Sequence, residues 1–151
     1  MIDFKNIVWP TDFSAHSDEA LKTALEFAKH FNAELHGVHV VESLPVLGAT
    51  GEHIPFNVAE YRNKLEQDAK KHLATVLSEK VPKDIPSHLH VFYGSPSRRI
   101  TEFAKSLDHP LIIISTHGMT GFQHFVHGSV AERVVRFSEC PVLSIRAEDK
   151  D

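Results

Sequence analysis

Apolar positions along the chain follow two alternating patterns. Short runs of consecutive apolar residues, such as Ile7-Val8-Trp9 and Leu111 to Ile114, are typical of strands that are buried on both faces. Between these runs, apolar residues recur every three or four positions, as they do along the buried stripe of a helix. The patterns predict strands near 7–9, 35–41, 89–93, 111–114 and 142–145, and helices near 14–31, from 57 to just before Pro82, near 96–107 and near 129–139.

Polar and proline residues mark the ends of these predicted helices. Ser14 and Asn57 stand where a side-chain oxygen caps the first turn of a helix. Pro96 has the position in the first turn that proline tolerates well, and Pro82 ends the long second helix. The boundaries therefore rest on capping chemistry as well as on periodicity.

Strands and helices alternate strictly, in one pass through 151 residues without an internal repeat. This order predicts a single α/β domain over residues 1–151, with one five-stranded, mainly parallel sheet and helices on both faces. In such sheets ligands bind beyond the carboxyl ends of the strands, where the strand order changes direction. The segments that follow the strands are therefore the places to search for a site.

The segment after the fourth predicted strand is rich in glycine. Gly118 and Gly121 are followed by Gly128-Ser129, which stands immediately before the last predicted helix. Glycine lets backbone N–H groups approach a phosphate closely, and a helix N-terminus favours an anion. A turn with a helix cap would give the same pattern, so the spacing alone leaves both interpretations open. The P-loop and dinucleotide-binding spacings are absent, which argues against a P-loop kinase or a dinucleotide-dependent dehydrogenase.

These residues resemble those of a known family. Ser115, Gly118 and Gly128-Ser129 have the spacing of G-x2-G-x9-G-[ST], the ATP-binding signature of the universal stress proteins, with Ser115 in place of the first glycine. The resemblance covers essentially the whole chain and implies a Rossmann-like fold of the adenine nucleotide alpha hydrolase type, with strand order 3-2-1-4-5. Its other segments are Pro10-Thr11-Asp12-Phe13-Ser14, His39-Val40, Gly94-Ser95-Pro96, Ser129 to Val134 and Cys140-Pro141-Val142-Leu143.

The resemblance implies an ATP site at the carboxyl ends of the first and fourth strands. Asp12 would contact the adenosine, Val40 would meet the adenine, and Ser115 and Gly118 would line the ribose and phosphates. ADP or AMP could take the place of ATP, and Mg²⁺ could accompany it. The implied binding residues are Pro10, Thr11, Asp12, Val40, Ser115, His117, Gly118, Gly128, Ser129 and Val130, the last three holding the phosphates.

Structural explanations compete at several of these positions. Asp12 also suits a turn, Val40 suits the core, and Ser129 suits a helix cap. His117 stands in the loop, where a hydrogen bond that orients the loop is as good an explanation as chemistry. Ser115 keeps its backbone amide, so it preserves binding if this position does not require torsions that glycine alone adopts.

The resemblance also implies what the protein does. We expect a nucleotide-binding stress-response module that acts through its bound state and through dimer contacts. No base is evidently placed to activate water and no acidic pair is dedicated to Mg²⁺, so we assign no catalytic residue. A slow ATPase or phosphotransfer protein, and an interaction dimer that binds no nucleotide, remain as alternatives. In the family's sheet order the final strand, 142–145, is an edge, which predicts a homodimer through it.

Composition narrows the list of partners. The formal net charge of −4 gives no reason to expect binding to nucleic acid or to an anionic membrane. Apolar runs are far shorter than the ~20 residues of a membrane span, and no signal peptide or disulfide framework is evident, so we expect a cytoplasmic protein. Twelve histidines are scattered along the chain. The pairs His36/His39 and His124/His127 lack further ligands nearby in the sequence, and we predict no metal.

Overall fold

The computed structural model describes residues 1–43, 57–116 and 129–146. Within these residues, five strands form one parallel sheet in the order β3-β2-β1-β4-β5. The predicted fold class and strand order are therefore confirmed. The strands are β1 (Asn6–Pro10), β2 (Glu34–Glu42), β3 (Ser87–Gly94), β4 (Pro110–Ser115) and β5 (Val142–Ile145).

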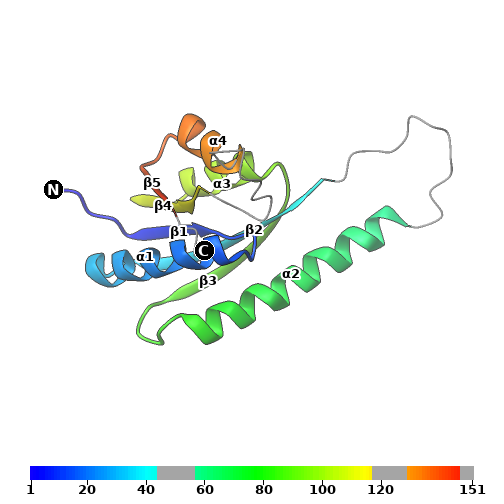
Figure 1. Ribbon diagram of the computed structural model, residues 1–151, viewed down its shortest axis with the longest axis horizontal. Helices are drawn as coiled ribbons and strands as arrows, with labels where there is room; N and C mark the ends of the chain where they lie inside the picture. Colours follow the sequence, from blue (N-terminus) through cyan, green and yellow to red (C-terminus); the bar gives the residue numbers. More distant parts are fainter. Residues whose placement is uncertain (44–56, 117–128, 147–151) are drawn as a thin grey trace, which may run out of the picture.

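Helices cover both faces of the sheet (Figure 1). They are α1 (Ala15–Phe31), α2 (Val58–Lys80), α3 (Pro96–Lys105) and α4 (Ser129–Phe137). The side chains of each strand alternate between the two faces, so the core has two parts. Under α1 and α2 it includes Ile7, Trp9, Leu21, Leu35 and Leu73, and under α3 and α4 it includes Val8, Val38, Ile100, Ile112 and Val134.

The predicted caps form. The Ser14 side chain accepts the N–H of Ser17 at 3.2 Å, and the Asn57 side chain accepts the N–H of Ala59 at 3.1 Å. The last helix ends two residues earlier than predicted, at Phe137. There the Ser138 hydroxyl accepts the N–H of Cys140 at 3.0 Å, which stabilises a turn in place of further helix.

Gly37 of β2 allows α2 to pack closely on the sheet. A Cβ atom at this position would lie 3.3 Å from the side chains of both Leu73 and Leu77. The missing side chain therefore lets the helix approach the strand. Next to Leu73, His72 of α2 lies against the ring of Phe13, which follows β1.

Three histidines gather where β2 pairs with β3. The ring of His36 stacks on those of His88 and His90, with centroids 4.9 and 5.2 Å away. His36 Nε2 donates to Asn6 Oδ1 at 2.9 Å, since the Asn6 amide nitrogen donates to a backbone carbonyl. His36 Nδ1 therefore accepts a hydrogen bond from His90 Nε2, 3.0 Å away. His39 lies on the opposite face of β2, so His36 and His39 cannot share a ligand.

Acid is expected to destabilise the fold through this cluster. Burial, followed by the charges of His90 and His88, lowers the pKa of His36 from 6.5 to about 4, and burial also lowers the pKa of His90. Between pH 6.5 and 4 the unfolded chain therefore binds protons that the folded chain does not. Stability is full above pH 6.5 and falls as the pH drops towards 4, by about 2 kcal/mol once solvent screening of these partly exposed rings is taken into account.

Thermal unfolding measured across this pH range tests the cluster. His36→Gln should flatten the dependence of the unfolding free energy on pH. His30→Gln, at an exposed site near the end of α1, should keep the wild-type slope. Equal slopes in the wild type and His36→Gln would show that this histidine does not cause the acid sensitivity.

Candidate functional site

The strand order changes direction between β1 and β4. From β1 the chain crosses to β2 on one side, whereas β4 and β5 lie on the other. Val8 of β1 is in register with Ile112 of β4, so the two strands end at a similar height. Thr11 and Asp12 follow β1, and Ser115 ends β4. The sheet therefore brings these predicted residues to the kind of crevice in which α/β proteins bind ligands.

Side chains organise the turn that leads from β1 to α1. The Thr11 hydroxyl accepts the N–H of Phe13 at 2.9 Å and lies 2.8 Å from the hydroxyl of Ser17. Ser17 Oγ donates to the carbonyl of Ser14, so the Thr11 hydroxyl donates to Ser17. Asp12 Oδ1 accepts the N–H of Ser14 at 3.0 Å. Asp12 thus has the turn role that the sequence left open, which holds its carboxylate in a fixed place beside the crevice.

Ser17 is a residue that sequence reasoning missed. Its side chain is buried, and its carbonyl accepts the indole N–H of Trp9 at 2.9 Å. It therefore joins the core of the sheet to the first turn of α1. The spacing Ser14-x-x-Ser17 was the available signal, because a cap and the third residue of its helix are neighbours.

The β1–β2 ladder stops just beyond Thr11. The Thr11 N–H donates to the Val38 carbonyl at 2.8 Å, one residue after the end of β1. The next ladder bond would join the Val40 N–H to the Thr11 carbonyl, but among the described residues the His39 ring donates to that carbonyl instead, from Nδ1 at 2.8 Å. The Val40 side chain packs in the core under α3 and α4, so the structural explanation for this residue also holds.

Phe13 connects the turn to β2 and α2. Its φ angle of 65° is left-handed, which is rare for an aromatic residue. Its ring stacks on His39 at a centroid distance of 4.4 Å and on His72 at 3.9 Å. Burial lowers the pKa of His39, although its bond to Thr11 and the charge of Asp12 oppose the shift. His39 is therefore predominantly neutral at pH 7, with its hydrogen on Nδ1.

Ser115 replaces glycine without backbone strain. It is a regular β4 residue, in register with Ile145, and it is not among the described residues with positive φ. The neighbouring Thr116 N–H donates to the Ile145 carbonyl at 2.9 Å. The first position of the signature therefore does not need torsions reserved for glycine.

Two of the remaining predicted positions, Ser129 and Val130, lie at the start of α4. Ser129 is the first residue of this helix and is exposed, and Val130 packs at the edge of the core under α3 and α4. His117, Gly118 and Gly128 lie outside the described residues, so their part in the site stays a prediction. Pro10, the last of the predicted set, is buried at the end of β1.

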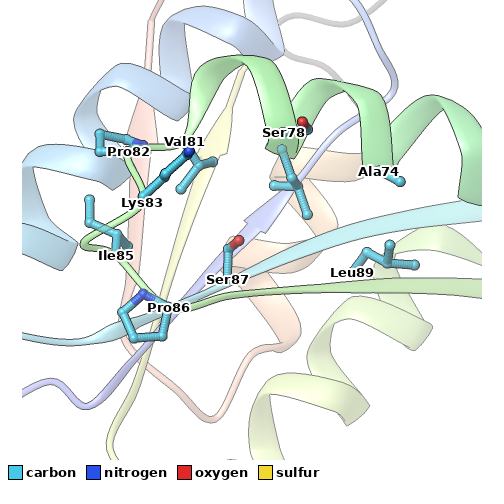
Figure 2. Close-up of a pocket in the computed structure, with 10 residues that line it drawn as sticks. Ala74, Ser78, Val81, Pro82, Lys83, Ile85, Pro86, Ser87 and Leu89 are labelled. Carbon is cyan, nitrogen blue, oxygen red and sulfur yellow. The ribbon is translucent and has the colours of Figure 1, made fainter.

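Among the described residues, one hollow lies away from this crevice and another lies at its margin. An apolar groove of about 510 Å³ lies between the end of α2 and the start of β3, at the amino ends of the strands (Figure 2). A second hollow, of about 550 Å³, lies beside α4 and the end of β5, with Thr116, Val135 and Ser144 among its lining residues. The groove is thus at the wrong end of the sheet for the predicted site.

Two classes of feature are absent from the part of the chain that the structure describes. No helix there is long and apolar enough to span a membrane. Nor do three or more histidine, cysteine or acidic side chains come together there in a way that could hold a metal ion.

Comparison with known proteins decides the family. Residues 3–146 match the model of the universal stress protein family. The chain belongs to this family. Among curated relatives of this universal stress protein, Universal stress protein MJ0531 of Methanocaldococcus jannaschii is 35% identical over 148 residues, which cover 98% of this chain and 85% of the relative. The solved structure of MJ0577, from the same organism, has a TM-score of 0.81 at 27% identity and covers 97% of this chain and 99% of its own.

Two structural neighbours of this universal stress protein hold nucleotides. One is a universal stress protein in complex with cAMP, with a TM-score of 0.60, 19% identity and coverage of 95% of this chain and 98% of that one. The other is the universal stress protein of Archaeoglobus fulgidus in complex with dAMP, with a TM-score of 0.57, 20% identity and coverage of 96% and 99%. At these identities the likeness shows a shared fold.

Proposed function

We propose that this universal stress protein binds ATP, or ADP or AMP in its place, at the carboxyl ends of β1 and β4. The observation that carries the proposal is the fixed turn at Asp12, which lies at the change of strand order and next to the end of the β1–β2 pairing. The neighbours in complex with cAMP and dAMP support an adenine nucleotide as the ligand. Mg²⁺ would accompany ATP at its phosphates.

In this proposal the adenosine and the phosphates occupy different parts of the crevice. Asp12 and Val40 contact the adenosine, with Pro10 and Thr11 beside them. Ser115, His117 and Gly118 line the ribose and phosphates. Gly128, Ser129 and Val130 hold the phosphates at the start of α4, where unpaired N–H groups and the helix dipole favour an anion. The unstrained backbone at Ser115 supports nucleotide binding over the alternative of an empty interaction dimer.

Replacing Asp12 with alanine tests the adenosine assignment. The variant should weaken ATP and adenosine binding together by about 1–3 kcal/mol, because one hydrogen bond to the nucleoside is lost. Calorimetric titration of both ligands measures the effect. Asp18→Ala on α1, which removes an ion pair with Lys80 of α2, is the matched control and should leave both affinities unchanged. Unaltered adenosine affinity in Asp12→Ala would refute the assignment.

We also propose that the protein is a cytoplasmic homodimer that acts through its nucleotide-bound state. In the sheet as described, β5 lies at an edge and pairs with β4. The carbonyls of Pro141 and Ile145 accept hydrogen bonds from the β4 side. The backbone polar groups of successive residues in a strand point to opposite sides. Val142 and Ser144 therefore direct their N–H and C=O groups away from β4. Val135 of α4, 53% exposed, lines the hollow beside Ser144 and would be covered by a second copy.

A further inference from the structure

We propose that His39 is a positioning residue of the candidate nucleotide site, because its ring keeps the Val40 main chain available to the base. This inference rests on the proposed function and names a residue that acts through others. The His39 ring takes the Thr11 carbonyl that the Val40 N–H would otherwise bond, and Phe13 fixes the ring in that position.

The direction of the Val40 backbone follows from the ladder. The Val38 carbonyl accepts the N–H of Thr11, so the polar groups of Val38 face β1. Backbone N–H and C=O groups that face one neighbouring strand recur at every second residue. Those of Val40 therefore also face the β1 side. The residue pairing of β1 with β2 ends at Pro10 and Val38. Beyond that point the N–H and C=O of Val40 face the opening at the end of β1.

His39 belongs to a stack of three aromatic rings that holds it in place. His39 and His72 both lie nearly parallel to the Phe13 ring, at interplanar angles of 28° and 13°. Two rings this close cannot share one face of a third ring, so Phe13 lies between them. The stack joins β2, the turn after β1, and α2. A shift of the His39 ring would therefore require movement in two neighbouring elements.

The main-chain groups of Val40 favour one kind of ligand. A main-chain N–H and C=O side by side match an edge that offers one acceptor and one donor, as the edge of adenine does. If His39 released the Thr11 carbonyl, the Val40 N–H could close the ladder onto it and would be lost to the base. His39 thus competes with the Val40 N–H for the Thr11 carbonyl and so favours pairing of this polar edge with a ligand.

Two variants of His39 separate its hydrogen bond from its ring. His39→Asn keeps a donor close to the place of Nδ1 but has no ring to stack. His39→Phe keeps the stack but has no donor. We expect adenosine to bind roughly tenfold more weakly to His39→Phe, and within about threefold of the wild type to His39→Asn, since one hydrogen bond accounts for about this range. Phe103→Leu, which removes ring contacts on the opposite face, is the control and should bind adenosine normally.

Amide hydrogen exchange at Val40 in the nucleotide-free protein gives a readout that does not depend on binding. Exchange should be slower in His39→Phe than in the wild type and His39→Asn, because the Val40 N–H then bonds to Thr11. Equal exchange and equal adenosine affinity in His39→Phe and the wild type would overturn the inference, as would an equal loss in both His39 variants. If the wild type binds no adenosine, the proposed function fails, whereas the exchange data still decide the role of His39.

Discussion

Replacing Gly128 with valine is expected to weaken ATP binding at least about a hundredfold, because two or more charge-assisted hydrogen bonds to phosphate would be lost. Gly128 stands directly before α4, which begins at Ser129. The first N–H groups of a helix have no partners within it, and they bind an anion only where the backbone can approach closely. A branched side chain at position 128 would keep the phosphates away from these groups. Calorimetric titration with ATP measures the loss.

The same substitution before another helix provides the control. Ser95 precedes α3, is exposed, and makes no side-chain capping bond. Its extended backbone accepts valine, so Ser95→Val should leave ATP affinity and melting temperature close to the wild-type values. Wild-type affinity for ATP in Gly128→Val would show that the N–H groups at the start of α4 do not bind the phosphates.

A proline at position 144 is expected to separate the proposed dimer into folded monomers. The Ser144 N–H points away from β4, so proline there removes a donor from the outer edge and leaves the β4–β5 ladder intact. Proline at Leu143 should act differently, because the Leu143 N–H faces β4. Leu143→Pro should destabilise the fold by about 3 kcal/mol, through a lost ladder bond and a steric clash.

Sedimentation at micromolar concentration and thermal unfolding, applied to all three proteins, distinguish these outcomes. The wild type should sediment as a dimer, Ser144→Pro as a monomer with a melting temperature near that of the wild type, and Leu143→Pro as a destabilised or unfolded chain. A monomeric wild type, or a dimeric Ser144→Pro, would contradict pairing through β5.

The elements of this fold could be predicted because local signals agreed with one another. Buried strands such as β4 are apolar at successive positions, and Ser14, Asn57 and Pro96 mark where helices begin. The end of α4 was less predictable, because it depends on a hydrogen bond between Ser138 and Cys140. The strand order came from the resemblance to a family, since the order of strands in a sheet is a tertiary property.

Residues for the candidate site could be proposed from the sequence, but the contacts among them could not. Asp12, Val40 and Ser115 were proposed because the segments around them resemble those of the family. The bond from His39 to the Thr11 carbonyl depends on the register of two strands 28 positions apart in sequence, and no local pattern reports it. The left-handed φ of Phe13 was also hidden, because aromatic residues rarely adopt it.

The contacts of the histidines could not be predicted from their spacing in the sequence either. His36 and His39 looked like a possible ligand pair by spacing, but an odd offset along a strand puts two side chains on opposite faces. His36 instead meets His88 and His90, which come from β3, more than 50 positions away in the sequence. Only the pairing of β2 with β3 brings these rings together.

The proposed ligand of the crevice at the ends of β1 and β4 is an adenine nucleotide. Calorimetric titration of ATP into the purified wild-type protein, after bound nucleotide has been removed by dialysis, tests it most directly. We expect saturable binding of one ATP per chain, with adenosine competing for the same site. A folded protein that takes up no ATP even at millimolar concentration would contradict it.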